Sequence, residues 1–86
     1  MKQYQYTPCG TCSRRIDIEI DPATRRLGRV SFTGGCNGNL KGIAALIKGQ
    51  ELDKVVSTLR GIECGNRGTS CPDQLARALE SISKEL

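Results

Sequence analysis

In the stretch RRIDIEI, residues 14–20, isoleucine residues alternate with charged residues. A period of two is typical of a β-strand that buries one face, so the isoleucines should point inward and the charges toward solvent. The next residues, DPAT at 21–24, have the composition of a turn, and a second strand is predicted near residues 27–32. These strands are expected to form an antiparallel hairpin, with residues 3–7 as a short edge strand.

After the hairpin, the apolar pattern changes to a helical period. Residues 40–47 carry apolar side chains at i, i+3, i+4 and i+7, with Asn39 as the predicted N-cap. A second helix is predicted over residues 52–59. A third begins at Ser70, where Asp73 is expected to complete a capping box by reaching back to the Ser70 amide. The order predicts an α+β fold, with a small antiparallel sheet of two to three strands followed by three helices packed on one face.

Length, charge and composition narrow the class of protein. The 86 residues are expected to form a single domain, 1–86. The N-terminal MKQYQYTP lacks the apolar segment of a secretory signal, and no stretch approaches the ~18 apolar residues of a membrane span. A cytoplasmic protein without a membrane partner is therefore expected. The net charge is +4, but acidic residues are interleaved with basic ones, and two Tyr and one Phe are too few for base stacking. Nucleic acid is not favoured as a partner.

Five cysteines are the main candidates for function, and they sit in predicted loops or at the ends of elements: Cys9, Cys12, Cys36, Cys64 and Cys71. Cytoplasmic thiols stay reduced unless they are catalytic or bound to metal. Zinc takes four tetrahedral ligands in structural sites, and because the chain has no His, such a site would consist largely of thiolates. Four thiolates and one zinc ion carry −4 + 2 = −2, which a chain of net charge +4 can accommodate.

Two other interpretations of the cysteines stay open. Free cysteine is often a small buried apolar residue, which needs no ligand. A dithiol redox role is the other, because Cys9 and Cys12 form a C-x-x-C. That motif precedes a strand here, whereas thioredoxin places its first cysteine at a helix start. Cys71, at a predicted helix N-terminus, is the better candidate for a reactive thiol.

A glycine-rich loop between the second strand and the first helix offers a different kind of site. Backbone amides in such a loop can bind a phosphate or nucleotide, helped by the N-terminus of the third helix. The loop does not match the P-loop or the dinucleotide fingerprint, and a turn that presents Cys36 explains it as well. The candidate residues are Gly34, Gly35, Asn37, Gly38, Asn39 and Ser70.

Four short motifs resemble those of a known family. Thr69-Ser70-Cys71-Pro72-Asp73 is the sequence that names the TSCPD family. The stretches 33–40, 10–13 and 61–65 are similar to its other hallmarks, in the same order. The resemblance runs from about Tyr6 to Leu79, which is nearly the whole chain.

The resemblance implies a set of four shared cysteines, which correspond by motif to Cys12, Cys36, Cys64 and Cys71. Cys9 lies outside that pattern, although spacing alone also permits a quartet of Cys9, Cys12, Cys64 and Cys71. A related domain forms the C-terminal part of many adenosylcobalamin-dependent ribonucleotide reductases. The resemblance implies a small accessory domain, and the chemistry of the cysteines predicts that it binds zinc. A nucleotide-binding module, or a thiol-redox partner of a ribonucleotide reductase in deoxynucleotide and DNA synthesis, are the alternatives.

Enzymatic activity of the chain alone stays open. With 86 residues, the chain is too short for the barrel that carries the radical chemistry and the cobalamin in such reductases. We therefore assign no catalytic residue.

Overall fold

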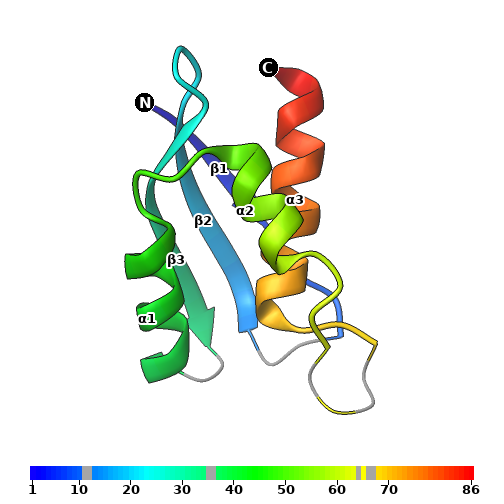
Figure 1. The fold of residues 1–86 in the computed structure, drawn as a ribbon. Helices are drawn as coiled ribbons and strands as arrows, with labels where there is room; N and C mark the ends of the chain where they lie inside the picture. The colour runs from blue at the N-terminus through cyan, green and yellow to red at the C-terminus, as the bar shows by residue number, and fades with distance from the viewer. Residues whose placement is uncertain (11–12, 35–36, 64, 66–67) are drawn as a thin grey trace.

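A computed structural model of the protein describes residues 1–10, 13–34, 37–63, 65 and 68–86. The strands come first and the helices follow (Figure 1), as the sequence predicted. The elements are β1 (Lys2–Tyr6), β2 (Ser13–Asp21), β3 (Arg26–Gly34), α1 (Asn37–Ile47), α2 (Leu52–Leu59) and α3 (Cys71–Glu85).

The three strands form one antiparallel sheet in the order β1-β2-β3, with β2 in the centre. Ile18 lies opposite Tyr4 on one side and opposite Val30 on the other. The turn between β2 and β3 is held by Asp21, whose carboxylate accepts a hydrogen bond of 3.0 Å from the backbone N–H of Ala23. The predicted hairpin and the predicted edge strand are both confirmed.

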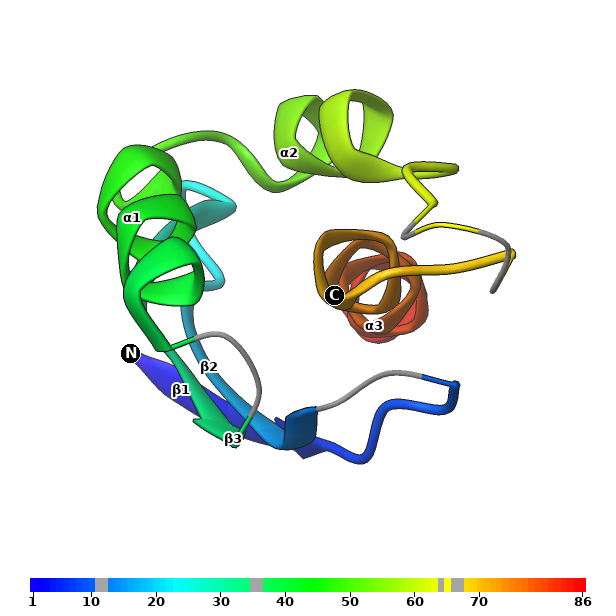
Figure 2. The same ribbon diagram turned by 90° about the horizontal axis from the view of Figure 1, so that it is seen from below.

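The core lies between one face of the sheet and the three helices. Figure 2 shows the sheet along one side of the molecule, with α1, α2 and α3 arranged over it. The isoleucines of β2 are at most 1% exposed, and Leu75 and Leu79 of α3 are fully buried in the same cluster. The alternating pattern at residues 14–20 therefore identified the inward face correctly, and the α+β prediction is confirmed.

Helix α1 begins three residues earlier than predicted, because an N-cap at Asn39 would make Leu40 the first helical residue. Asn39 was expected to be its N-cap, but the helix starts at Asn37. The apolar stripe marks where a helix meets the core, which is not always where it starts. Gly38 and Asn39 are exposed, and Leu40, the next residue, is buried. Among the residues that the structure describes, no helix is both long and apolar enough to cross a membrane.

Candidate functional site

The first turn of α3 is preceded by a buried serine whose hydroxyl both donates and accepts a hydrogen bond. Ser70 is the N-cap of α3, and its Oγ accepts a hydrogen bond of 3.1 Å from the backbone N–H of Asp73. The same hydroxyl donates to the backbone carbonyl of Ile62 at 2.6 Å. Ser70 therefore caps the helix, as predicted, and also holds the chain that leads out of α2.

Asp73 does not complete the predicted capping box. Its side chain is fully buried, and its carboxylate accepts hydrogen bonds from the backbone N–H of Gly61 at 2.6 Å, from Thr69 Oγ1 at 2.6 Å and from Arg77 Nε at 2.8 Å. The expectation of a bond to the Ser70 amide was wrong because the segment after α2 crosses this turn. The backbone N–H of Gly61 in that segment donates to the Asp73 carboxylate instead.

These contacts fix the charge of Asp73. Burial by itself would raise the pKa of the carboxyl group, because it disfavours the charged form. The hydrogen bonds from Thr69, from the Gly61 backbone and from Arg77, together with the positive charge of Arg77, outweigh burial. They lower the pKa from 3.8 to about 2. Asp73 is therefore a buried anion at neutral pH, with Arg60 also 3.9 Å away.

Gln74, the next residue of α3, connects the helix to the end of β1 and to the residues that follow it. Its side chain is buried, and its Oε1 accepts hydrogen bonds from the backbone N–H of Cys9 at 3.0 Å and from the Tyr6 hydroxyl at 3.4 Å. Its Nε2 donates to Thr69 Oγ1 at 2.9 Å. Thr69 in turn donates to the Asp73 carboxylate, and Ser70 accepts from the backbone N–H of Asp73. Thr69, Ser70, Asp73 and Gln74 therefore form one connected polar network, which we call the α3 network.

Cys71, the first residue of α3, lies beside this network and contacts the start of the central strand β2. It is 9% exposed, and its Sγ is 3.0 Å from Ser13 Oγ. Ser13 begins β2 and lies opposite Gly34, the last residue of β3. The thiol that the sequence placed at a helix N-terminus is therefore packed against the sheet. This burial limits reagent access, which the sequence-based expectation of a reactive thiol did not take into account.

The other three predicted zinc ligands, Cys12, Cys36 and Cys64, lie outside the described residues. Within the described part of the chain, no group of three or more His, Cys, Asp or Glu side chains is arranged to hold a metal. The described residues that lead into the three cysteine-bearing segments can be located, however. The start of β2, the end of β3 and the starts of α1 and α3 all lie at the same end of the molecule (Figure 1).

The residues predicted to bind phosphate belong to different structural elements. Gly34 ends β3 with φ of 85°, a conformation that favours glycine, so this position has a structural reason to be Gly. Asn37, Gly38 and Asn39 already belong to α1, and Gly35 lies outside the described residues. Ser70 Oγ is occupied by Asp73 and Ile62. Phosphate binding at this loop stays a prediction.

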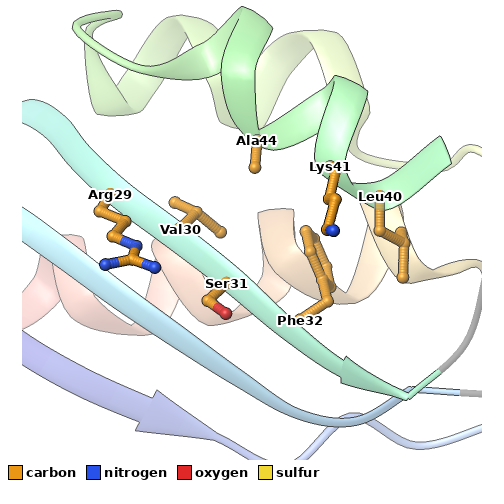
Figure 3. Close-up of a pocket in the computed structure, with 7 residues that line it drawn as sticks. All are labelled: Arg29, Val30, Ser31, Phe32, Leu40, Lys41 and Ala44. Carbon is orange, nitrogen blue, oxygen red and sulfur yellow. The ribbon is translucent and has the colours of Figure 1, made fainter. Parts of the chain in front are cut away.

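A shallow pocket between β3 and α1 has different chemistry (Figure 3). Among the described residues, its lining contains neither a cysteine nor a carboxylate. The two cationic groups, from Arg29 and Lys41, lie toward different ends of the pocket in Figure 3. The pocket therefore offers no metal ligand. The lining residues are Arg29, Val30, Ser31, Phe32, Leu40, Lys41 and Ala44.

The α3 network was missed by sequence reasoning, although one signal was available. Ser70, Asp73, Gln74 and Arg77 are spaced i, i+3, i+4 and i+7, so they share one side of the helix. Such a stripe is usually taken to face solvent. Here Ser70, Asp73 and Gln74 are each at most 5% exposed.

Comparison with known proteins gives one match. A family model described as "TSCPD domain" matches residues 1–83. No curated protein and no solved structure matches the chain. The matched region contains all five cysteines and the complete α3 network.

Proposed function

The chain belongs to the TSCPD domain family, and from this premise we propose that it is a metal-binding accessory module. The proposed ligands are the thiolates of Cys12, Cys36, Cys64 and Cys71, and the proposed metal is zinc. A closed tetrahedral set of four thiolates leaves no open coordination position, which is typical of structural zinc sites. Bound zinc would supply a cross-link between segments that are distant in sequence.

The observation that carries this proposal is the contact of 3.0 Å between Ser13 Oγ and Cys71 Sγ. Ser13 directly follows Cys12 in sequence, and its strand partner Gly34 is two residues from Cys36. Ile62, two residues before Cys64, is bound by Ser70 beside Cys71. Two residues of chain span at most about 7 Å. In sequence, each of the other three proposed ligands is therefore one or two residues away from a described residue that contacts Ser70, Cys71 or Ser13.

The donor set also fits zinc. Soft thiolates suit this ion, and the chain contains no His to compete for a position. Asp73 is nearby, but its carboxylate oxygens are already bound by Gly61, Thr69 and Arg77, so it is not a proposed ligand. Burial of Cys71 would help to keep water away from the site.

Two alternatives from the sequence have less support. A phosphate site that uses Ser70 would have to compete with its two existing hydrogen bonds. A redox role as a partner of a ribonucleotide reductase needs an accessible thiol; Cys71 is buried, so among the described cysteines this role would depend on the exposed Cys9. A ribonucleotide reductase as the physiological partner is what the family resemblance implies, and it remains part of the proposal.

The decisive experiment is metal analysis of protein purified without chelator. We expect about one zinc per chain, by analogy with structural four-thiolate sites. Cys71→Ser and Cys36→Ser should lose the zinc. A well-folded protein with all five thiols titratable and no metal would contradict the proposal and would favour the redox alternative.

A further inference from the structure

The side chains of the α3 network form hydrogen bonds with backbone groups of segments outside α3. Asp73 accepts from the N–H of Gly61, and Ser70 donates to the carbonyl of Ile62. Gln74 accepts from the N–H of Cys9. Buried polar side chains are costly unless they are hydrogen-bonded, so these partners have to be retained in the folded chain. The network therefore dictates the course of two segments that do not belong to α3.

Both segments lead toward a proposed zinc ligand. Residues 60–62 precede Cys64, and residues 6–9 precede Cys12. Residues 60–62 contact Asp73, and residues 6–9 contact Gln74, which is the next residue of α3. Both segments are therefore held near the first turn of α3, where Cys71 lies. Gly10 adds a further close contact in the second segment, because a Cβ at this position would lie 3.1 Å from Thr69 Cγ2.

We propose that Ser70, Asp73 and Gln74 are positioning residues of the zinc site, which hold residues 60–62 and 6–9 beside Cys71. This inference rests on the proposed function. None of the three residues is proposed to touch the metal. Their role is to set the course of the ligand-bearing segments before zinc binds.

The physical reason is the cost of ordering loops. Fixing each residue of a flexible segment costs conformational entropy, and a metal that must order its own ligand loops binds more weakly by that amount. Hydrogen bonds that order the segments beforehand remove part of this cost from the binding step. Groups that orient metal ligands from outside the coordination sphere typically contribute ~10- to 100-fold to affinity.

The test measures zinc affinity by competition with a chromophoric chelator, at a temperature where every variant is folded. The variants are Ser70→Ala, Asp73→Asn and Gln74→Leu. The matched control is Ile82→Val, a core change in the distant half of α3. We expect the three network variants to bind zinc at least ~10-fold more weakly than wild type. The control should bind as wild type does, although its melting temperature falls.

Two further measurements separate positioning from simple destabilisation. Ser70→Thr keeps a hydroxyl that can bond both Asp73 and Ile62, so we expect it to restore most of the affinity that Ser70→Ala loses. The Co²⁺-substituted Asp73→Asn and Gln74→Leu proteins should have altered absorption bands, because the geometry of the thiolates changes. Ile82→Val should have the wild-type spectrum.

The inference is overturned if the folded network variants bind zinc as tightly as wild type. It is also overturned if affinity follows melting temperature equally in all variants, Ile82→Val included. If wild type binds no zinc, the proposed function fails and this inference fails with it, which is a distinguishable result. If Asp73→Asn does not fold, Ser70→Ala and Gln74→Leu decide the question.

Discussion

The Oε1 atom of Gln74 accepts a hydrogen bond of 3.0 Å from the backbone N–H of Cys9, although 65 positions separate them in sequence. The contact uses the peptide group of Cys9 and leaves its exposed thiol outside the α3 network. The hydrogen bond that joins position 9 to α3 therefore does not require a cysteine side chain.

This relationship predicts that Cys9→Ser leaves both zinc content and melting temperature nearly unchanged. Serine keeps the backbone N–H that Gln74 binds, and the side chain that changes is exposed. Cys36→Ser, the matched variant at a proposed ligand, should lose the zinc and lower the melting temperature. Metal analysis and thermal unfolding of the two variants check this. The opposite pattern would move the site to Cys9, Cys12, Cys64 and Cys71.

The low pKa of Asp73 predicts a pH-dependent contribution to stability. The pKa is about 2 in the folded protein against 3.8 as the ordinary value, so the folded state favours the ionised carboxylate. This contribution is fully present above pH ~4 and is lost as the pH falls toward 2, and it amounts to about 2 kcal/mol. Urea unfolding of wild type and Asp73→Asn under identical metal conditions measures it. The difference between the two proteins should shrink from pH 5 to pH 2.

The exposed ion pair between Arg60 and Glu80 serves as the control for this measurement. Its side chains are 43% and 41% exposed, and exposed pairs contribute about 0–1 kcal/mol. Glu80→Gln should therefore change the unfolding free energy little over the same range, from pH ~5 to pH ~2. A pH-independent difference between wild type and Asp73→Asn would show that the charge of Asp73 is not what stabilises the fold.

The core makes a prediction that is independent of any metal. Leu79 is fully buried in α3, whereas Leu46 of α1 is 78% exposed. Leu79→Ala should lower the unfolding free energy by about 3 kcal/mol, because it removes buried apolar surface and leaves a cavity. Leu46→Ala, the same substitution on another helix, should cost less than about 0.5 kcal/mol. Equal losses in chemical denaturation would contradict the burial of Leu79 in the core.

The local pattern was sufficient for the fold but not for the α3 network. The isoleucines at 16, 18 and 20 all lie on one face of a strand, and a period of two reports that directly. Helix periodicity located α2 and α3 equally well. Asn39 was misassigned because helix α1 begins before its apolar stripe reaches the core.

The roles of Asp73 and Gln74 depend on partners that sequence spacing does not identify. The Ser70–Asp73 spacing fits a capping box, and half of that motif is present. The carboxylate instead binds Gly61, 12 positions away, and the amide of Gln74 binds Cys9, 65 positions away. Such contacts arise only once the chain is folded, which is why a polar helix face could be mistaken for a solvent-facing one.

If the chain is a zinc-binding module, we expect that the glycine-rich segment around the end of β3 does not bind phosphate or nucleotide. Titration of inorganic phosphate or a nucleotide into the protein, up to millimolar concentration, should leave the NMR amide signals of Gly34, Gly38 and Asn39 in place. Gly34 ends a strand, whereas Gly38 and Asn39 lie in the first turn of α1, so these residues belong to separate elements and not to one phosphate-binding loop. Saturable shifts confined to these residues would revive the phosphate alternative. Shifts spread over the arginines would indicate nonspecific electrostatic attraction.

The last prediction concerns the order in which Cys9 and Cys71 react with an alkylating reagent. Cys9 is exposed, whereas Cys71 is buried with its Sγ 3.0 Å from Ser13 Oγ. In the folded protein, a reagent must reach the sulfur before the thiolate fraction matters, so burial should slow the reaction of Cys71. We therefore expect iodoacetamide to modify Cys9 first and Cys71 much later, with the order resolved by mass spectrometry of peptides over time.

Unfolding in urea with chelator should bring the two alkylation rates together, because the shielding of Cys71 comes from the fold. Chelator alone should accelerate Cys71 if zinc also protects it, yet Cys9 should stay faster. Rapid alkylation of Cys71 in the folded, metal-loaded protein would contradict both its burial and its proposed role as a zinc ligand.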